Sequence, residues 1–95
     1  MPRITHKIPV LDLNQSAFHM LHGDNPQEEM QPGGRVAFMH EAGELFYELS
    51  GRYNSNEAVP VQDYVNCQRQ LRARMMSLKN GNGNGKRTNN GRRDF

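Results

Sequence analysis

The chain has 95 residues, with 12 basic and 10 acidic side chains and a formal net charge of +2. This length corresponds to one small domain, and the single cysteine excludes an intramolecular disulfide and a cysteine-rich zinc site. No stretch approaches the roughly 18 apolar residues of a membrane span, and the first ten residues hold no apolar run of signal-peptide length. We therefore expect a soluble cytoplasmic protein that does not bind membranes.

The charge is divided unequally along the chain. Residues 1–78 carry seven basic and nine acidic side chains, whereas residues 79–95 carry five and one. In the C-terminal segment asparagine alternates with glycine, cations follow, and only the terminal phenylalanine could fill a core. Such a segment buries too little apolar surface to offset the entropy cost of ordering it. We expect one folded domain over residues 1–79 and a disordered basic tail over residues 80–95.

The first part of the chain predicts a short strand followed by a helix. Residues 8–11 are β-prone, but Pro9 cannot donate to a ladder and therefore indicates an edge strand. Asp12, with Gln15 three residues on, matches a capping box that opens a helix ending at Gly23. The apolar residues at helical spacing in it are Leu13, Ala17, Met20 and Leu21.

The next segment predicts a β-hairpin. Residues 28–31 form a weak strand, residues 32–34 (Pro-Gly-Gly) give a strong turn signal, and residues 35–40 form the clearest strand of the chain. Period-two alternation in this last strand sends Val36, Phe38 and His40 to one face and Arg35, Ala37 and Met39 to the other. We expect Phe38 at the centre of the core.

Two further helices are predicted. The first covers residues 42–53, with Leu45, Leu49 and Tyr53 on one stripe and Phe46 beside it. We expect Leu49 to be buried together with Phe38. A second stripe of this helix is spaced for an i, i+4 ion pair and holds Glu44, Glu48 and Arg52.

The last helix should run over residues 61–79, with Pro60 before its first turn and Asn80-Gly81 as its stop. Its inward stripe repeats every seven residues at Tyr64, Leu71 and Leu78, and the intervening turns are filled by Cys67, Gln68 and Met75. Met76 falls outside this stripe and is the better candidate for an exposed contact.

The element order is β-α-β-β-α-α. It predicts a small α+β domain, in which an antiparallel sheet of two to three short strands packs with three helices on one face.

Four short motifs resemble those of a family of small bacterial and phage-associated α+β domains of unknown function. They are the Asp12–Ala17 helix start, the Gly34–Phe38 strand, the Leu49–Tyr53 helix and the Arg69–Arg72 run. The resemblance covers residues 8–78 and implies a fold but no activity.

The histidines suggest one candidate metal site. His19 and His22 are three residues apart on the first helix, which would place both rings on one face, and the nearest further ligands are Asp24 and His40. The alternative is structural: two exposed or half-buried histidines at a helix end, where they interact favourably with the helix dipole. We favour the structural interpretation and assign no metal and no cofactor.

No pattern indicates a nucleophile. Cys67 lies on an Arg- and Gln-rich helix with no glycine motif for an oxyanion hole nearby, so a buried or half-buried structural cysteine is expected. The sequence also lacks a G-x-S-x-G elbow and a phosphate-binding loop. We expect no enzymatic activity.

Basic residues late in the last helix and in the tail could contact phosphates without reading bases. These possible nucleic-acid contacts are Arg69, Arg72, Arg74, Lys79, Lys86, Arg87, Arg92 and Arg93. The alternative for the helix cations is that they complement the helix dipole on a solvated face.

Together these features favour a non-enzymatic accessory or interaction domain of bacterial or phage origin. Its expected partner is an unknown protein or a second copy of itself, bound through a helical face or a sheet edge. The alternative is a non-specific nucleic-acid-binding accessory protein that uses the basic residues named above. A third class, a metal-dependent enzyme centred on His19 and His22, is the least favoured.

Overall fold

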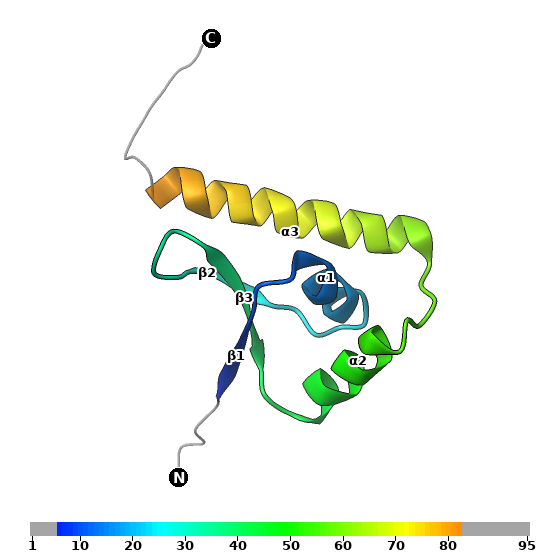
Figure 1. Ribbon diagram of the computed structural model, residues 1–95. Coiled ribbons are helices and arrows are strands. Elements are labelled where there is room, and N and C mark those ends of the chain that lie inside the picture. The colour runs from blue at the N-terminus through cyan, green and yellow to red at the C-terminus, as the bar shows by residue number, and fades with distance from the viewer. Residues whose placement is uncertain (1–5, 83–95) are drawn as a thin grey trace.

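The helices and strands follow the predicted order β-α-β-β-α-α (Figure 1). The computed structural model describes residues 6–82, and most of the predicted tail lies outside them. The elements are β1 (Lys7–Val10), α1 (Leu13–Leu21), β2 (Gln27–Met30), β3 (Val36–Glu41), α2 (Glu44–Asn54) and α3 (Val61–Asn82). The fold is α+β, with one three-stranded antiparallel sheet and three helices, as the sequence predicts.

The sheet has the strand order β1-β3-β2, so the clearest predicted strand lies in its centre. β1 is an edge strand, as Pro9 requires, and it pairs antiparallel with β3 so that Pro9 lies opposite Met39. The turn between β2 and β3 uses two glycines with positive φ, Gly33 at 89° and Gly34 at 85°. Glycine adopts this left-handed conformation without the strain that a side chain would add.

Asp12 caps α1, as predicted. Its Oδ1 accepts a hydrogen bond from the backbone N–H of Asn14 at 2.9 Å. The second half of the predicted capping box does not form, because the side chain of Gln15 is directed toward Ser50 and His19 instead. The helix ends one turn before Asp24, whose backbone N–H donates to the carbonyl of His19 at 2.9 Å.

The core lies between the sheet, α1 and α3. Ala17, Phe38 and Leu71 are fully buried against one another, one from each of these elements. Five half-buried side chains pack around them: Leu13, Met20, Tyr64, Cys67 and Met75. The predicted burial of Phe38 and of Leu49 is confirmed, with 1% and 0% of their surface exposed. Leu49, however, lies outside the cluster around Phe38 because α2 packs mainly on α1.

The inner stripe of α2 differs from the predicted one. Phe46 and Leu49 are buried, whereas Leu45 is 46% exposed. Phe46 turns inward because it packs against the rings of His19 and His40, with centroid distances of 5.0 and 5.7 Å. The predicted ion pair is confirmed, since Arg52 lies 3.2 Å from Glu48.

α3 continues to Asn82, past its predicted stop at Asn80-Gly81. Asparagine and glycine are poor helix formers, but each lowers the stability of the helix relative to alanine by only about 1 kcal/mol or less. The packing of Leu71 and Met75 anchors the preceding turns of the helix.

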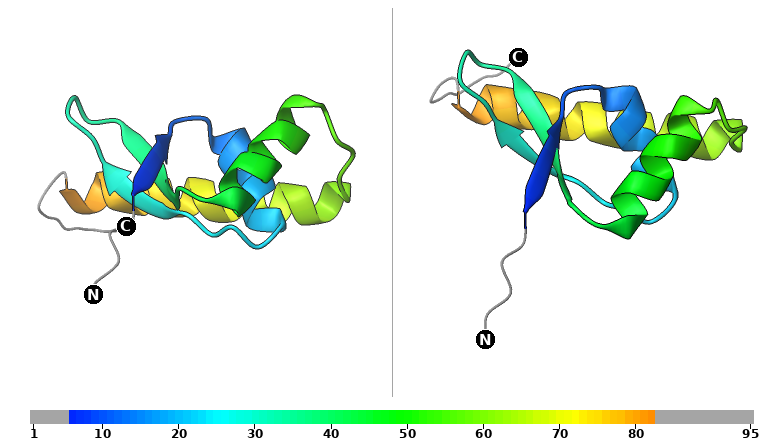
Figure 2. Two further views of the ribbon diagram at one scale, coloured as in Figure 1. Left: turned by 90° about the horizontal axis from the view of Figure 1, so that it is seen from below. Right: turned by 60° about the horizontal axis from the view of Figure 1, so that its bottom comes forward.

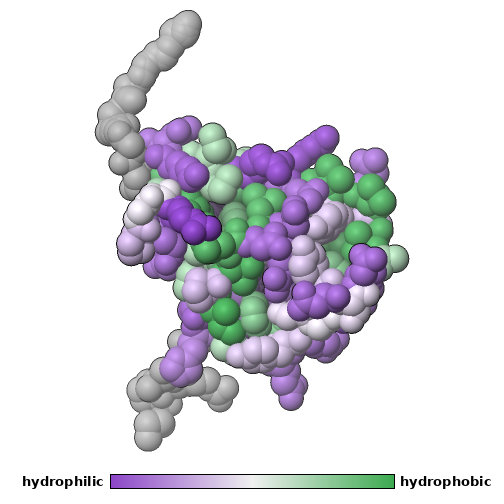
Figure 3. Space-filling view, viewed as in Figure 1, coloured by the Kyte–Doolittle hydropathy of each residue, from purple (hydrophilic) through white to green (hydrophobic). Residues whose placement is uncertain are grey.

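The two faces of the sheet differ. Val36, Phe38 and His40 of β3 are buried toward the helices, and α3 runs along this inner side (Figure 2). None of the three helices of the described chain covers the outer face (Figure 2). In the view of Figure 3 the surface is largely polar, and apolar residues form separate patches.

Candidate functional site

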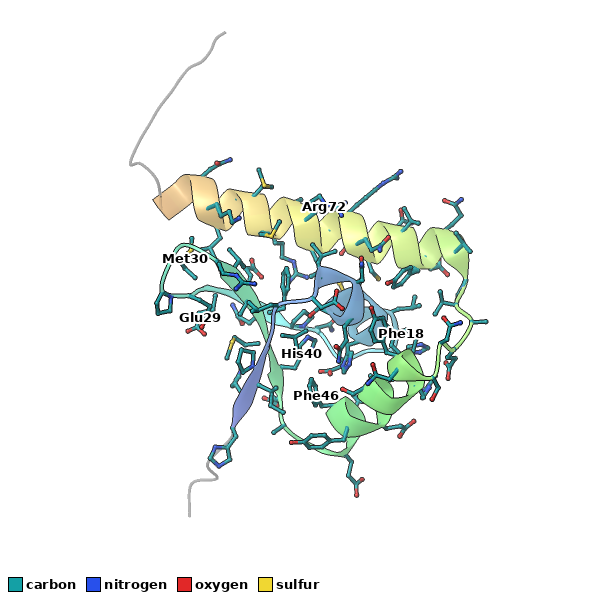
Figure 4. All side chains as sticks on the ribbon, in the orientation of Figure 1. Phe18, Glu29, Met30, His40, Phe46 and Arg72 are labelled. Carbon is teal, nitrogen blue, oxygen red and sulfur yellow. The ribbon has the colours of Figure 1, made fainter. Side chains whose placement is uncertain are left out.

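Three polar side chains meet in the interior at the junction of α1, α2 and the sheet. His19 comes from the last turn of α1, Asp24 from the loop that follows it, and His40 from β3. Figure 4 shows His40 and Phe46 pointing into the space between β3 and α2. We call His19, Asp24 and His40 the His-Asp-His cluster.

One carboxylate oxygen joins the two imidazole rings. Oδ2 of Asp24 lies 2.8 Å from Nδ1 of His19 and 3.2 Å from Nδ1 of His40. A carboxylate oxygen only accepts, so each Nδ1 carries a hydrogen and donates to it. With its hydrogen on Nδ1, each ring can accept a hydrogen bond only at Nε2.

Hydroxyl groups complete the cluster on its far side. The Oγ of Ser16 lies 3.0 Å from Nε2 of His40 and can donate to it. The corresponding contact to Nε2 of His19 is weaker, because Ser50 Oγ and Gln15 Nε2 both lie 3.4 Å away. The cluster therefore has a partner for every ring nitrogen of the two histidines.

The cluster is enclosed. The side chains of both histidines are fully buried, and that of Asp24 is 12% exposed. Burial lowers the pKa of His40, because removing the imidazolium from water outweighs the attraction of Asp24. A neutral imidazole with an Nδ1–H agrees with the hydrogen-bond geometry.

Ser16, His40 and Asp24 stand in the order of nucleophile, base and orienting carboxylate. Catalysis would require the Ser16 hydroxyl to reach a substrate carbonyl. Ser16 is fully buried, with 0% of its surface exposed. In this conformation the three residues act as a hydrogen-bonded core and not as an accessible nucleophile.

The His19–His22 pair, considered from sequence as a metal site but not favoured, is not the pair that meets in the cluster. His22 is half-buried against Phe18, with a centroid distance of 4.7 Å, and its Nε2 is 3.9 Å from Glu57. The expectation that His19 would be exposed or half-buried is wrong. Helix α1 directs Ser16 and His19 to the interior. There the carboxylate of Asp24 is the partner of His19, and His40 of β3 is the partner of Ser16. The two further ligands considered from sequence, Asp24 and His40, are the residues that meet His19.

Cys67 is half-buried on α3 and packs against the core, as the structural interpretation predicts. Burial, followed by the charge of Asp63, raises the pKa of its thiol. A raised pKa disfavours the thiolate, which is the nucleophilic form. Cys67 is therefore a packing residue.

The basic residues of α3 divide into two groups. Arg69, Arg72 and Lys79 are exposed. Arg74 is half-buried, and its guanidinium donates to the carbonyl of Pro26 and to Glu28, both at 3.3 Å. Arg74 therefore holds α3 against β2. The other four predicted contacts lie outside the described residues: Lys86, Arg87, Arg92 and Arg93.

No protein-family model matches the chain, and no curated protein or solved structure matches it. The resemblance noted from sequence therefore stays a prediction. Within residues 6–82, no helix has the length and apolar character needed to cross a membrane.

Proposed function

We propose that the chain is a non-enzymatic interaction domain that binds another protein through the outer face of its sheet. The observation that carries this proposal is the contrast between the two sides of the sheet. The buried polar side chains Ser16, His19 and His40 are enclosed on the inner side. The outer side is left open by the three described helices.

The strand register defines this outer face. Met39 lies at its centre, opposite Pro9 on β1 and Gln27 on β2. Ala37 is on the same face, opposite Glu29, but it is fully buried, so Met39 and not Ala37 offers contact area there. Two open hollows lie on it, of about 330 and 310 Å³. The first is lined by Lys7, Gln27, Glu28, Glu29 and Met39, and the second by Pro9, Leu11, Gln31, Pro32, Arg35 and Ala37.

This arrangement resembles a protein interface more than a phosphate-binding surface. Leu11, which is 49% exposed, lines the second hollow together with Pro9 and Pro32, and polar and charged residues lie around them. Protein interfaces have an apolar centre with a polar rim. The rim holds two cations, Lys7 and Arg35, and two anions, Glu29 and Glu41. A face with both signs of charge can complement a second copy of itself, so self-association is the first case to test.

Sedimentation velocity over a range of concentrations tests this case. Wild-type protein should form a concentration-dependent dimer, and Met39→Glu should shift it to monomer by placing a charge at the apolar centre. The matched control is Tyr47→Glu, because Tyr47 is 61% exposed on α2 and lines neither hollow of the outer face. Dissociation by the control variant but not by Met39→Glu would contradict an interface on the outer face.

A photo-crosslinking residue at position 39 extends the test to other partners. In cells, adducts should form from position 39 and disappear when the second variant Leu11→Glu is added. A crosslinker at position 47 should give no adduct of the same mass. A monomeric protein with identical adducts from both positions would refute the proposed interface.

A second candidate is non-specific nucleic-acid binding, which the exposure of Arg69 and Arg72 favours. These two arginines are three residues apart on α3 and make no ion pair within residues 6–82. Affinity for a random duplex should be weak and fall steeply with salt. Deleting residues 80–95 should remove most of it and reduce the logarithmic salt slope by about four, one for each cation lost. Tight binding that survives this deletion would refute a tail-dominated contact.

A further inference from the structure

We propose that His19, Asp24 and His40 form a binding site for a divalent transition-metal ion, with Zn²⁺ as the best-fitting ion. The site is independent of the outer face of the sheet, because it lies on the opposite, inner side. The three residues come from α1, the following loop and β3, so a bound ion would connect three segments of the fold.

The ligand atoms already converge. Each residue offers one atom, and these atoms all lie within 4.8 Å of one another. Ligand atoms of a tetrahedral zinc site are about 3.4 Å apart, as follows from metal–ligand distances of about 2.1 Å. The contacts of Asp24 to the two Nδ1 atoms, 2.8 and 3.2 Å, are slightly shorter than this separation. The widest separation, up to 4.8 Å, is longer than the tetrahedral value, so a small outward movement of the Asp24 carboxylate and a closer approach of the widest pair of ligand atoms would admit the ion.

The donor set selects the class of ion. Two imidazoles with one carboxylate suit Zn²⁺ and its neighbours, whereas Mg²⁺ and Ca²⁺ prefer oxygen ligands alone. The fourth ligand would be water. It would enter beside Asp24, because the side chains of both histidines are fully buried.

The surrounding hydroxyls fit the metal-bound state as well as the metal-free one. A histidine that binds metal through Nδ1 carries its hydrogen on Nε2 and donates it to an outer partner. Ser16 Oγ stands 3.0 Å from Nε2 of His40, and Ser50 Oγ stands 3.4 Å from Nε2 of His19. A hydroxyl both donates and accepts, so the same serines serve either tautomer. The Gln15 amide can turn its oxygen toward His19 in the same way.

Metal binding would therefore exchange the tautomers of two buried histidines. Without metal, both Nδ1 atoms donate to Asp24, and the serines donate to Nε2. With metal, the proton leaves Nδ1 to water and the freed Nδ1 lone pair binds the ion, while Nε2 takes up a proton from water, so that each ring stays neutral and its Nε2–H donates to its serine. This exchange is a signature that a nonspecific surface site would not produce at His19 and His40.

Nitrogen-15 NMR of the histidine rings in the full-length chain provides the test. Protein treated with chelator should show Nδ1–H tautomers at His19 and His40. Added Zn²⁺ should convert both to the Nε2–H form with a deprotonated, metal-bound Nδ1. Nδ1–H tautomers that persist in excess Zn²⁺, or changes confined to His6 and His22, would overturn the proposal.

Affinity measurements with matched variants give an independent readout, with tetrahedral Co²⁺ absorption as the probe. Ser16→Ala should weaken metal binding by about 10- to 100-fold, as expected for loss of an outer partner. Asp24→Asn should weaken it further, and circular dichroism will show that the variant is folded. His22→Gln should leave affinity unchanged, because His22 lies beside Phe18 and Glu57. Equal affinities of wild type and Asp24→Asn would overturn the proposal.

Discussion

Replacing Phe38 with alanine should remove a large part of the protein's stability at room temperature. Phe38 is 1% exposed and packs against Ala17 of α1 and Leu71 of α3. Removing a buried phenyl ring costs about 3–5 kcal/mol, from lost transfer free energy and the cavity that remains. A domain of this size has a free energy of unfolding on the order of 4–10 kcal/mol. The loss therefore matches the whole stability at the lower end of this range and is up to half of it at the upper end.

Urea denaturation followed by circular dichroism measures this effect. Leu45→Ala is a suitable control, because Leu45 is 46% exposed although it lies on the same predicted apolar stripe as Leu49. Its free energy of unfolding should change by no more than about 0.5 kcal/mol. An unchanged denaturation midpoint for Phe38→Ala would remove Phe38 from the core.

The strands were predictable because their signals are local. Alternation in residues 35–40 identifies the inward face of β3, and two adjacent glycines at positive φ mark the turn before it. Pro9 restricts β1 to an edge for a covalent reason, since it has no N–H to donate. These features depend on only a few neighbouring residues, so tertiary packing did not alter them.

The orientation of α2 was not fully predictable. Leu45 and Phe46 are adjacent, so they lie about 100° apart around a helix and either could join Leu49 on its inner side. The choice depends on what lies across from the helix. The rings of His19 and His40 offer Phe46 an aromatic surface, and Leu45 turns to solvent. That surface exists only once α1 and β3 are in place.

The His-Asp-His cluster was only partly visible in the sequence. Period-two alternation places His40 on the same face as Val36 and Phe38, which correctly indicates burial. The spacing of His19 and His22 drew attention to the wrong pair, because adjacency on a helix does not show which side is buried. Buried histidines need partners, and Asp24 supplies one from a loop whose course sequence spacing does not reveal.

The second large effect is expected from Asp24→Ala in the presence of a chelator. Oδ2 of Asp24 accepts hydrogen bonds from two fully buried imidazoles. Removing the carboxylate leaves two buried Nδ1–H donors without their acceptor, at about 1–3 kcal/mol for each. The total loss should be about 2–6 kcal/mol, at the lower end if water enters beside the exposed edge of residue 24.

Asp24→Asn is the matched control for this loss. The amide keeps a carbonyl oxygen that can accept from both rings, so its cost should be clearly smaller than that of alanine. Urea denaturation of both variants at neutral pH, with chelator present throughout, separates this contribution from any stabilisation by metal. If alanine and asparagine at position 24 gave the same stability as wild type, the two histidines would not depend on Asp24. The cluster would then be held by Ser16, Ser50 and the packing of Phe46 alone.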